Sequence, residues 1–269
     1  SGMSVTNPLS GAFDKLFIAM ADPVEEKVLH MVTADPARTP TFTPFAQGDY
    51  FLNASALTTT PTVCTNSSNT ADLSSCVFLP NVAPPNQTFA WNHGGVQPEV
   101  AATWLGLVGP GVAKNAKVGG DFFSDHTDVR PTMLTLTGLN DSYVSDGRVL
   151  TEMLKNSALP ESVKTGARMQ ELGQAYKQIM ASFGQFSLDT LAASTRALAS
   201  SSAGDSTYNT IENQLAALGS DRDALASQIR AGLWNAEFNG QPISQQQAKA
   251  WIDQANAILA AAAALIDVW

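Results

Sequence analysis

The hydrophobic pattern after Leu150 constrains the fold more than any other feature of the sequence. From this point apolar residues recur at alternating spacings of three and four, which places them on one face of an α-helix. The four series are Met169, Leu172, Tyr176, Ile179 and Phe183; Leu188, Leu191, Thr195 and Leu198; Ile211, Leu215, Leu218, Leu225, Ile229 and Leu233; and Trp251, Ala255, Ile258, Ala262, Leu265 and Trp269. Breaks fall at Gly184, residues 200–204, Gly219 and residues 239–242. The pattern predicts an antiparallel helical bundle with a mostly aliphatic seam.

The chain before this pattern has a different composition. Pro, Thr and Asn are frequent in the first part, whereas Ala, Gln, Leu and Ser dominate after Asp146. Such a change within one chain is typical of two folding units. We therefore expect one domain over residues 1–150 and a second, the bundle, over residues 151–269.

Several elements can be predicted in the first domain. Apolar residues on one face predict an amphipathic helix over residues 9–20, and Pro23 can begin a further helical turn. The apolar, β-prone run over residues 28–33 predicts a strand. His30 alternates within this run, and neither an acid nor a second histidine is close to it in sequence. We therefore expect it to be packed in or beside a sheet.

A strand and a capped helix are predicted further along. Residues 103–108, TWLGLV, are short and apolar and end at Gly109-Pro110-Gly111, which is typical of a strand covered on both faces. Asp128 can cap a helix that has Pro131 in its first turn and stops at Gly138.

Charge and hydropathy exclude two classes of partner. The net charge of -9 and the absence of any Lys or Arg run argue against nucleic acid, which normally requires a clustered basic face. The most apolar stretch, residues 257–268, is shorter than the ~20 residues that a transmembrane helix requires. We expect no transmembrane segment.

Cys64 and Cys76 lie in a segment rich in Thr, Ser and Asn. No other Cys or His is near enough in sequence to complete a metal site, so we interpret the pair as a disulfide that closes a surface loop. Four Asn-x-Ser/Thr tripeptides begin at Asn53, Asn66, Asn86 and Asn140. Both features indicate a secreted, periplasmic or cell-surface protein.

An ordered series of short motifs resembles the C-terminal part of the alkaline phosphatase superfamily, especially its type I phosphodiesterase/nucleotide pyrophosphatase and sulfatase-like branches. The motifs are His93-Gly94, Gly109-Pro110-Gly111, His-x-Asp-x-x-Pro-Thr-x-Leu over residues 126–134, and Asp146-Gly147-Arg148. The resemblance covers roughly the first 150 residues. It implies an α/β fold there, with part of an alkaline-phosphatase-like sheet and flanking helices, followed by the all-α bundle.

The resemblance implies that His93 is a metal ligand, with zinc as the expected ion. Asn92 and Gly94 would shape the loop around it, and the glycines leave the imidazole uncrowded. In place of an acid after the His-Gly pair, this chain has Gly95. His126 is a possible second ligand, although a histidine between capping residues is more often part of the capping network.

Asp35 and Arg38 form a polar pair in a Pro-rich loop. They could line the entrance for substrate, or form a local salt bridge that braces the turn.

The motifs of the resemblance predict an enzymatic function that needs residues beyond those of this chain. The nucleophile and the earlier Asp and Asp-His-Gly ligands of the superfamily have no match here, so an upstream catalytic half would be the partner. We expect the C-terminal portion of a metal-dependent hydrolase of small phosphate mono- or diesters, with little activity alone. The alternative is a non-catalytic interaction module on the same scaffold, which would bind a protein partner through the helical bundle.

Overall fold

The computed structural model describes residues 4–6, 12–15, 17–47, 50–51, 79–80, 82–83, 87–88, 94–114, 122–200 and 202–267. Most of the described chain is helical. The helices are α1 (Pro23–Val28), α2 (Pro98–Ala101), α3 (Val129–Thr137), α4 (Glu161–Thr165), α5 (Met169–Met180), α6 (Gln185–Leu198), α7 (Ser206–Phe238) and α8 (Gln245–Ile266). Five short 3-10 helices are η1 (Pro36–Arg38), η3 (His126–Asp128), η4 (Thr151–Met153), η5 (Asn156–Ala158) and η6 (Ala203–Asp205).

The strands of the described chain form two-stranded antiparallel pairs. They are β1 (Ser4–Thr6) with β2 (Phe13–Lys15), β3 (Phe17–Ala21) with β4 (Thr43–Ala46), β5 (Tyr50–Phe51) with β6 (Leu79–Pro80), and β7 (Val82–Ala83) with β8 (Gln87–Thr88). The larger α/β sheet implied by the resemblance is not seen among the described residues.

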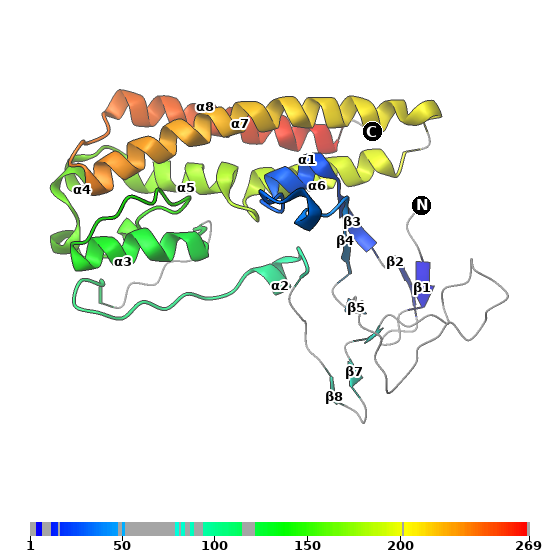
Figure 1. The fold of residues 1–269 in the computed structure, drawn as a ribbon, viewed down its shortest axis with the longest axis horizontal. Coiled ribbons are helices and arrows are strands. Elements are labelled where there is room, and N and C mark those ends of the chain that lie inside the picture. Colours follow the sequence, from blue (N-terminus) through cyan, green and yellow to red (C-terminus); the bar gives the residue numbers. More distant parts are fainter. Residues whose placement is uncertain are drawn as a thin grey trace.

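The helical bundle predicted after Leu150 is confirmed. Helices α5 and α6 follow one another along one side, α7 runs back past both of them, and α8 returns beside α7 (Figure 1). The predicted breaks at Gly184, at residues 200–204 and at residues 239–242 each fall between two helices. None of the described helices is long and apolar enough to cross a membrane.

The predicted break at Gly219 is wrong, because α7 is continuous from Ser206 to Phe238. A glycine inside a helix costs only about 1 kcal/mol relative to alanine. Leu215 and Leu225, on either side of it, are both buried in the bundle. Burial of large aliphatic side chains contributes roughly 1.5–3 kcal/mol each, which exceeds the cost of the glycine.

The core of the bundle lies between α5, α7 and α8. Its buried residues include Leu172, Tyr176 and Ile179 from α5, Leu225, Ile229 and Leu233 from α7, and Ala248, Ile252 and Ala255 from α8. Small side chains on α8 let it approach its neighbours closely, since Ala248, Ala255 and Ala262 have no exposed surface.

The N-terminal segment packs on the bundle at α6 and α7. Strand β3 contacts α6, and α1 contacts both α6 and α7. The predicted helix over residues 9–20 is wrong where the structure describes it, since residues 13–15 and 17–21 are strands. Pairing of β3 with β4 and packing on α6 override the helical spacing of the apolar residues.

The predicted strand over residues 28–33 is also wrong. Asp22 and Glu25 form a reciprocal capping box that begins α1 at Pro23, as expected, and the helix extends through Val28. His30 then adopts a left-handed backbone with φ of 59° and lies exposed in the turn after α1. Only Val28 of this run lies in the helix, and residues 29–33 form the turn and the irregular chain that follow it.

Helix α3 matches its prediction closely. It follows Asp128 and ends at Gly138, which has a left-handed φ of 67°. The capping hydrogen bonds are made one turn earlier, where Asp125 accepts from Thr127 N and Asp128 accepts from Asp125 N. Asp128 also accepts from the backbone N of Arg148 at 2.9 Å, so it ties α3 to the Asp-Gly-Arg turn.

Buried polar contacts join the two parts of the chain across the predicted boundary at Leu150. Lys177 of α5 is 1% exposed and lies 2.8 Å from an oxygen of Asp125 and 3.3 Å from one of Asp128. Glu237 of α7 accepts a hydrogen bond from Val149 N at 2.9 Å. Two buried charged side chains of the bundle, Lys177 and Glu237, thus have their partners in the first part of the chain. The division into domains over residues 1–150 and 151–269 stays a prediction.

Residues 102–108 form no strand with any other described residue. The segment runs from α2 to the Gly-Pro-Gly turn apart from the bundle (Figure 1). Trp104 is 87% exposed and Val108 is fully exposed. The strand prediction fails because a strand needs neighbours for its backbone hydrogen bonds, and the described chain offers none here.

Candidate metal centre

Three acidic side chains meet at the junction of α1 and α7. Asp22 and Glu25 belong to the capping box of α1: Asp22 accepts from Val24 N at 3.0 Å, and Glu25 accepts from Asp22 N at 3.3 Å. This reciprocal cap fixes both carboxyl groups at the start of the helix. Local sequence therefore determines two of the three members.

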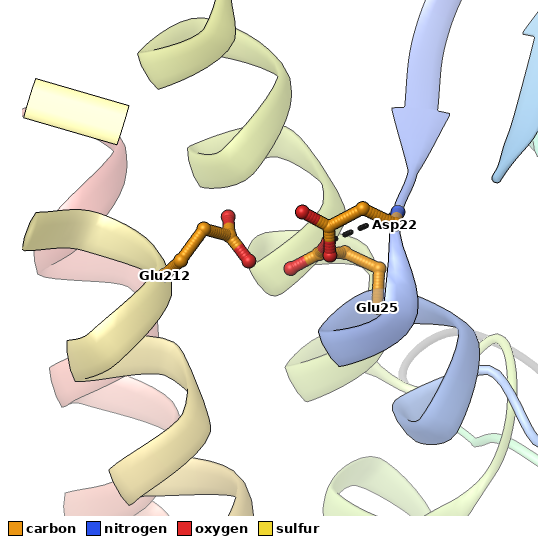
Figure 2. Close-up of side chains that lie close together, drawn as sticks. All are labelled: Asp22, Glu25 and Glu212. Atoms are coloured by element: carbon orange, nitrogen blue, oxygen red, sulfur yellow. Dashed lines mark hydrogen bonds between the residues drawn. The ribbon is translucent and has the colours of Figure 1, made fainter. Parts of the chain in front are cut away.

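The third member, Glu212, comes from the first half of α7. Ile211, the residue before Glu212, belongs to a buried cluster against which Val24 of α1 and Tyr208 of α7 pack. These contacts hold this part of α7 against α1. One ligand oxygen from each of the three residues lies within 4.8 Å of the others. Figure 2 shows Glu212 pointing across the gap between the two helices toward Asp22 and Glu25.

Three carboxylate oxygens of this group have no hydrogen-bond donor among the described residues. Glu25 is 1% exposed, and its Oε1 is buried without a hydrogen-bond partner in the described part of the chain. Both oxygens of Glu212 are in the same situation. A buried anion without a donor or a cation is costly, so each carboxyl must be protonated or bind a positive ion.

The pKa shifts agree with this environment. Burial, together with the hydrogen bond with Asp22 and the charges of Glu212 and Asp22, raises the pKa of Glu25 to about 10. Burial, together with the charge of Asp22, also raises the pKa of Glu212 to about 7. The site can therefore hold protons or a cation.

The chemistry of the three ligands indicates which ions they would prefer. All three ligands are carboxylates, which suit hard divalent cations such as Ca²⁺, Mg²⁺ and Mn²⁺. The zinc site implied by the resemblance would include histidine. Among the described residues, the one group of three close metal ligands contains none. The zinc site implied by the resemblance centres on His93, which lies outside the described residues, so it stays a prediction.

Some of the residues proposed from the sequence lie outside the described residues. These are His93 and Asn92 of the metal loop and Cys64 and Cys76 of the disulfide, so both assignments stay predictions. Gly94 is described: it is exposed and has a φ of 101°, which side chains other than glycine rarely adopt.

Asp35 and Arg38 lie exposed on the loop after α1. Asp35 caps η1 by accepting from Ala37 N at 3.0 Å, and its carbonyl accepts from Arg38 N at 3.0 Å. The turn is thus braced through its backbone, and the salt bridge between the two side chains is not found among the described ion pairs. Whether the pair lines a substrate entrance stays a prediction.

The two described histidines lie in turns at the surface. His126 begins η3 and is exposed, while its neighbours Asp125 and Asp128 make the capping hydrogen bonds. His30 lies in the turn after α1, where partial loss of solvent around its ring, together with the charge of Arg222, lowers its pKa. The structure brings neither histidine into a group of three metal ligands in the described chain.

The acidic group was not predicted from the sequence. The Asp-Pro-Val-Glu pattern of residues 22–25 is visible as a capping box, but capping explains it fully. Nothing in the sequence indicates that Glu212 meets it, because this depends on how α7 packs against α1.

No protein family, no curated protein and no solved structure matches this chain.

Proposed function

We propose that this chain is the C-terminal section of a metal-dependent hydrolase of phosphate mono- or diesters, and that residues 102–108 join the sheet of an upstream catalytic half. The motif series described above suggests the enzyme class. The observation that carries the proposal is the uncovered apolar segment, which has the sequence of an interior strand and no described neighbour.

The exposure of this segment is the first argument. Trp104, Leu105 and Val108 are among the large apolar side chains that the described structure leaves exposed, at 87%, 40% and 102%. Each would contribute roughly 1.5–3 kcal/mol or more if it were fully buried. A continuous apolar run of this kind is typical of a strand with both faces covered, as in parallel α/β sheets.

The ends of the segment are fixed. Helix α2 precedes it, and after the Gly-Pro-Gly turn Val112 pairs with Leu154. Lys155 donates from its backbone N to Gly111 O at 2.8 Å. A segment that is held at both ends, and that has no backbone partner in the described part of the chain, is well suited to accept a strand from another polypeptide segment.

The remaining motifs pack together. A Cβ at Gly147 would come within 2.0 Å of the carbonyl oxygen of Thr127, so only glycine allows the Asp-Gly-Arg turn to lie against the 126–134 motif. A Cβ at Gly111 would come within 2.4 Å of Leu136. The motifs therefore form one structural unit, which supports treating them as one family signature.

In this proposal His93 supplies one ligand to a metal centre whose other ligands and nucleophile come from the upstream half. The ion would activate the nucleophile and stabilise charge on the phosphoryl oxygens. The acidic group at Asp22, Glu25 and Glu212 has no part in this chemistry.

Activity measurements test the enzyme class. The 269-residue chain should not hydrolyse bis-p-nitrophenyl phosphate in the presence of zinc, manganese or magnesium. A chain extended upstream to include the nucleophile should do so, and His93→Ala should remove most of that activity. His126→Ala is the matched control, since His126 is exposed, and it should retain activity. If the 269-residue chain hydrolyses the substrate and His93→Ala abolishes that activity, the proposal that catalysis requires an upstream half is wrong.

Association measurements test the docking segment. Val108→Asp should leave the stability of this chain unchanged, because the side chain is fully exposed, but should weaken its binding to a separately expressed upstream half. An upstream half that binds but lacks nucleophile and ligands would instead favour the non-catalytic interaction module.

A further inference from the structure

We propose that Asp22, Glu25 and Glu212 bind a hard divalent cation, with Ca²⁺ as the best fit, and that this ion fastens α1 to α7. The inference rests only on described residues and is independent of the proposed hydrolase function.

The spacing of the ligands fits one ion. Two oxygens bound to the same Ca²⁺ at about 2.4 Å can be at most about 4.8 Å apart. The ligand oxygens of the three residues lie within 4.8 Å of one another. The three side chains converge from the N-terminus of α1 and from α7 (Figure 2). One ion placed between them can therefore contact all three residues with small adjustments of side-chain torsions.

A buried, unpaired carboxylate oxygen inside the group is the second argument. Glu25 is almost completely buried, and its Oε1 has no hydrogen-bond donor among the described residues. Figure 2 shows its carboxylate directed toward Glu212, whose own two oxygens also lack donors. Capping of α1 uses the other oxygen of Glu25 and so does not account for this arrangement.

No basic side chain among the described residues forms an ion pair with this group. The basic residues on α1, α6 and α7 form ion pairs elsewhere in the described structure: Lys27 and Arg222 with Asp223, Arg196 with Asp267, and Arg230 with Asp146. Three carboxyl groups thus share a partly buried space without a positive partner. A divalent ion would supply the missing positive charge.

The remaining coordination positions favour Ca²⁺ over Zn²⁺. Calcium takes six to eight oxygen ligands in flexible geometry, with carboxylates bound through one or two oxygens. Asp22 and Glu212 are partly exposed, so water can complete the coordination sphere. Structural zinc instead favours Cys and His ligands, which this group lacks.

Thermal unfolding with added metal tests the proposal on the purified 269-residue chain. After treatment with a chelator, CaCl₂ at 100 times the dissociation constant should raise Tm by roughly 5–10 °C, because the ion binds the folded state alone. Glu25→Gln and Glu212→Gln should each lose this shift. Asp221→Asn, which removes an exposed acid from the same helix, is the matched control and should keep it.

Terbium luminescence gives a second readout that does not depend on unfolding. Tyr208 lies one turn before Glu212 and packs in the same cluster as Val24, so it can sensitise a Tb³⁺ ion in the site. Tyrosine-excited emission that Ca²⁺ displaces, and that is lost in Glu212→Gln, would support the site. The proposal is overturned if wild-type Tm does not respond to Ca²⁺, Mg²⁺ or Mn²⁺, or if both Gln variants respond as wild type does.

Discussion

The bundle core and the 102–108 segment are both apolar, yet one is buried and the other is exposed. Leu172, Ile229 and Ala255 have no exposed surface, whereas Trp104 and Val108 lie open to solvent. The difference follows from what each element needs. A helix satisfies its backbone hydrogen bonds internally and requires only an apolar stripe from its neighbours, and α5, α7 and α8 supply that to one another. A strand requires neighbours for its backbone as well.

An apolar pattern therefore specifies a fold only where the elements that cover it lie in the same chain. The helices predicted for the bundle are present in the described chain, and residues from each of their stripes are buried, although Phe183 and Leu198 are exposed. The pattern of residues 102–108 is equally strong, but its fulfilment depends on a sheet that the described residues do not contain.

Removal of the first part of the chain should have the largest effect. A chain that begins at Thr151 loses Asp125 and Asp128, the two partners of Lys177, which is 1% exposed. Removal of the first part also takes away Ala19, Ala21 and Phe45, which are buried together with Leu191 of α6. Chemical denaturation should therefore show a large loss of stability compared with the full chain.

This prediction opposes the expectation that the bundle is an independent domain. Equal stability of the shortened and full chains would favour the division at Leu150 and would mean that the contacts across it contribute little.

Truncation of one apolar side chain in each region tests the comparison directly. Leu172→Ala creates a cavity in the bundle core, because Leu172 has no exposed surface, and should cost about 2–5 kcal/mol in urea unfolding. Val108→Ala should change stability by less than about 0.5 kcal/mol. A large effect of Val108→Ala on the isolated chain would show that the segment is already covered.

The pH dependence of stability should reveal the buried acid at the contact between the two parts. Burial raises the pKa of Glu237 to about 8, against an ordinary value of 4.5. Between these two pH values the folded state holds a proton that the unfolded state has lost. The contribution of Glu237 to stability therefore falls as pH rises through this window, by about 1.4 kcal/mol per pH unit, and becomes constant above pH 8.

Glu237→Gln, which mimics the protonated acid and keeps the oxygen that accepts from Val149 N, should remove this part of the slope. Denaturation midpoints of the two proteins should coincide near pH 4 and diverge toward pH 8, with the variant more stable. Parallel curves over this range would exclude Glu237 as the source.

The sequence predicted the elements whose determinants are local. The start of helix α3 after Asp128 and its end at Gly138 are each determined by residues close in sequence, and the structure has both. The same holds for the bundle helices and for the turns between them, except at Gly219. Residues 9–20 and 28–33 were assigned wrongly because pairing of β3 with β4, and the capping box of α1, outweigh the spacing of apolar residues.

The candidate site was less accessible to prediction. Asp22 and Glu25 have a sufficient local explanation as capping residues, and Glu212 lies on a helix whose other residues do not mark it. Only the packing of α1 on α7 brings their charges together. The reverse holds for His93: the sequence indicates that it binds a metal ion, but it lies outside the described residues.

The smallest predicted effect concerns the one bundle break that the sequence suggested wrongly. Gly219 lies inside α7, and a Cβ built on it meets no atom within 4 Å, so Gly219→Ala should stabilise the chain by up to about 1 kcal/mol in urea unfolding. Gly232 of the same helix is the control, because a Cβ there would come within 2.7 Å of the Trp251 ring. Its replacement by alanine has the same propensity gain but forces Trp251 to move, so it should yield no stabilisation. If Gly219→Ala destabilises the chain, α7 is bent or interrupted at this position, and the break expected from the sequence is real.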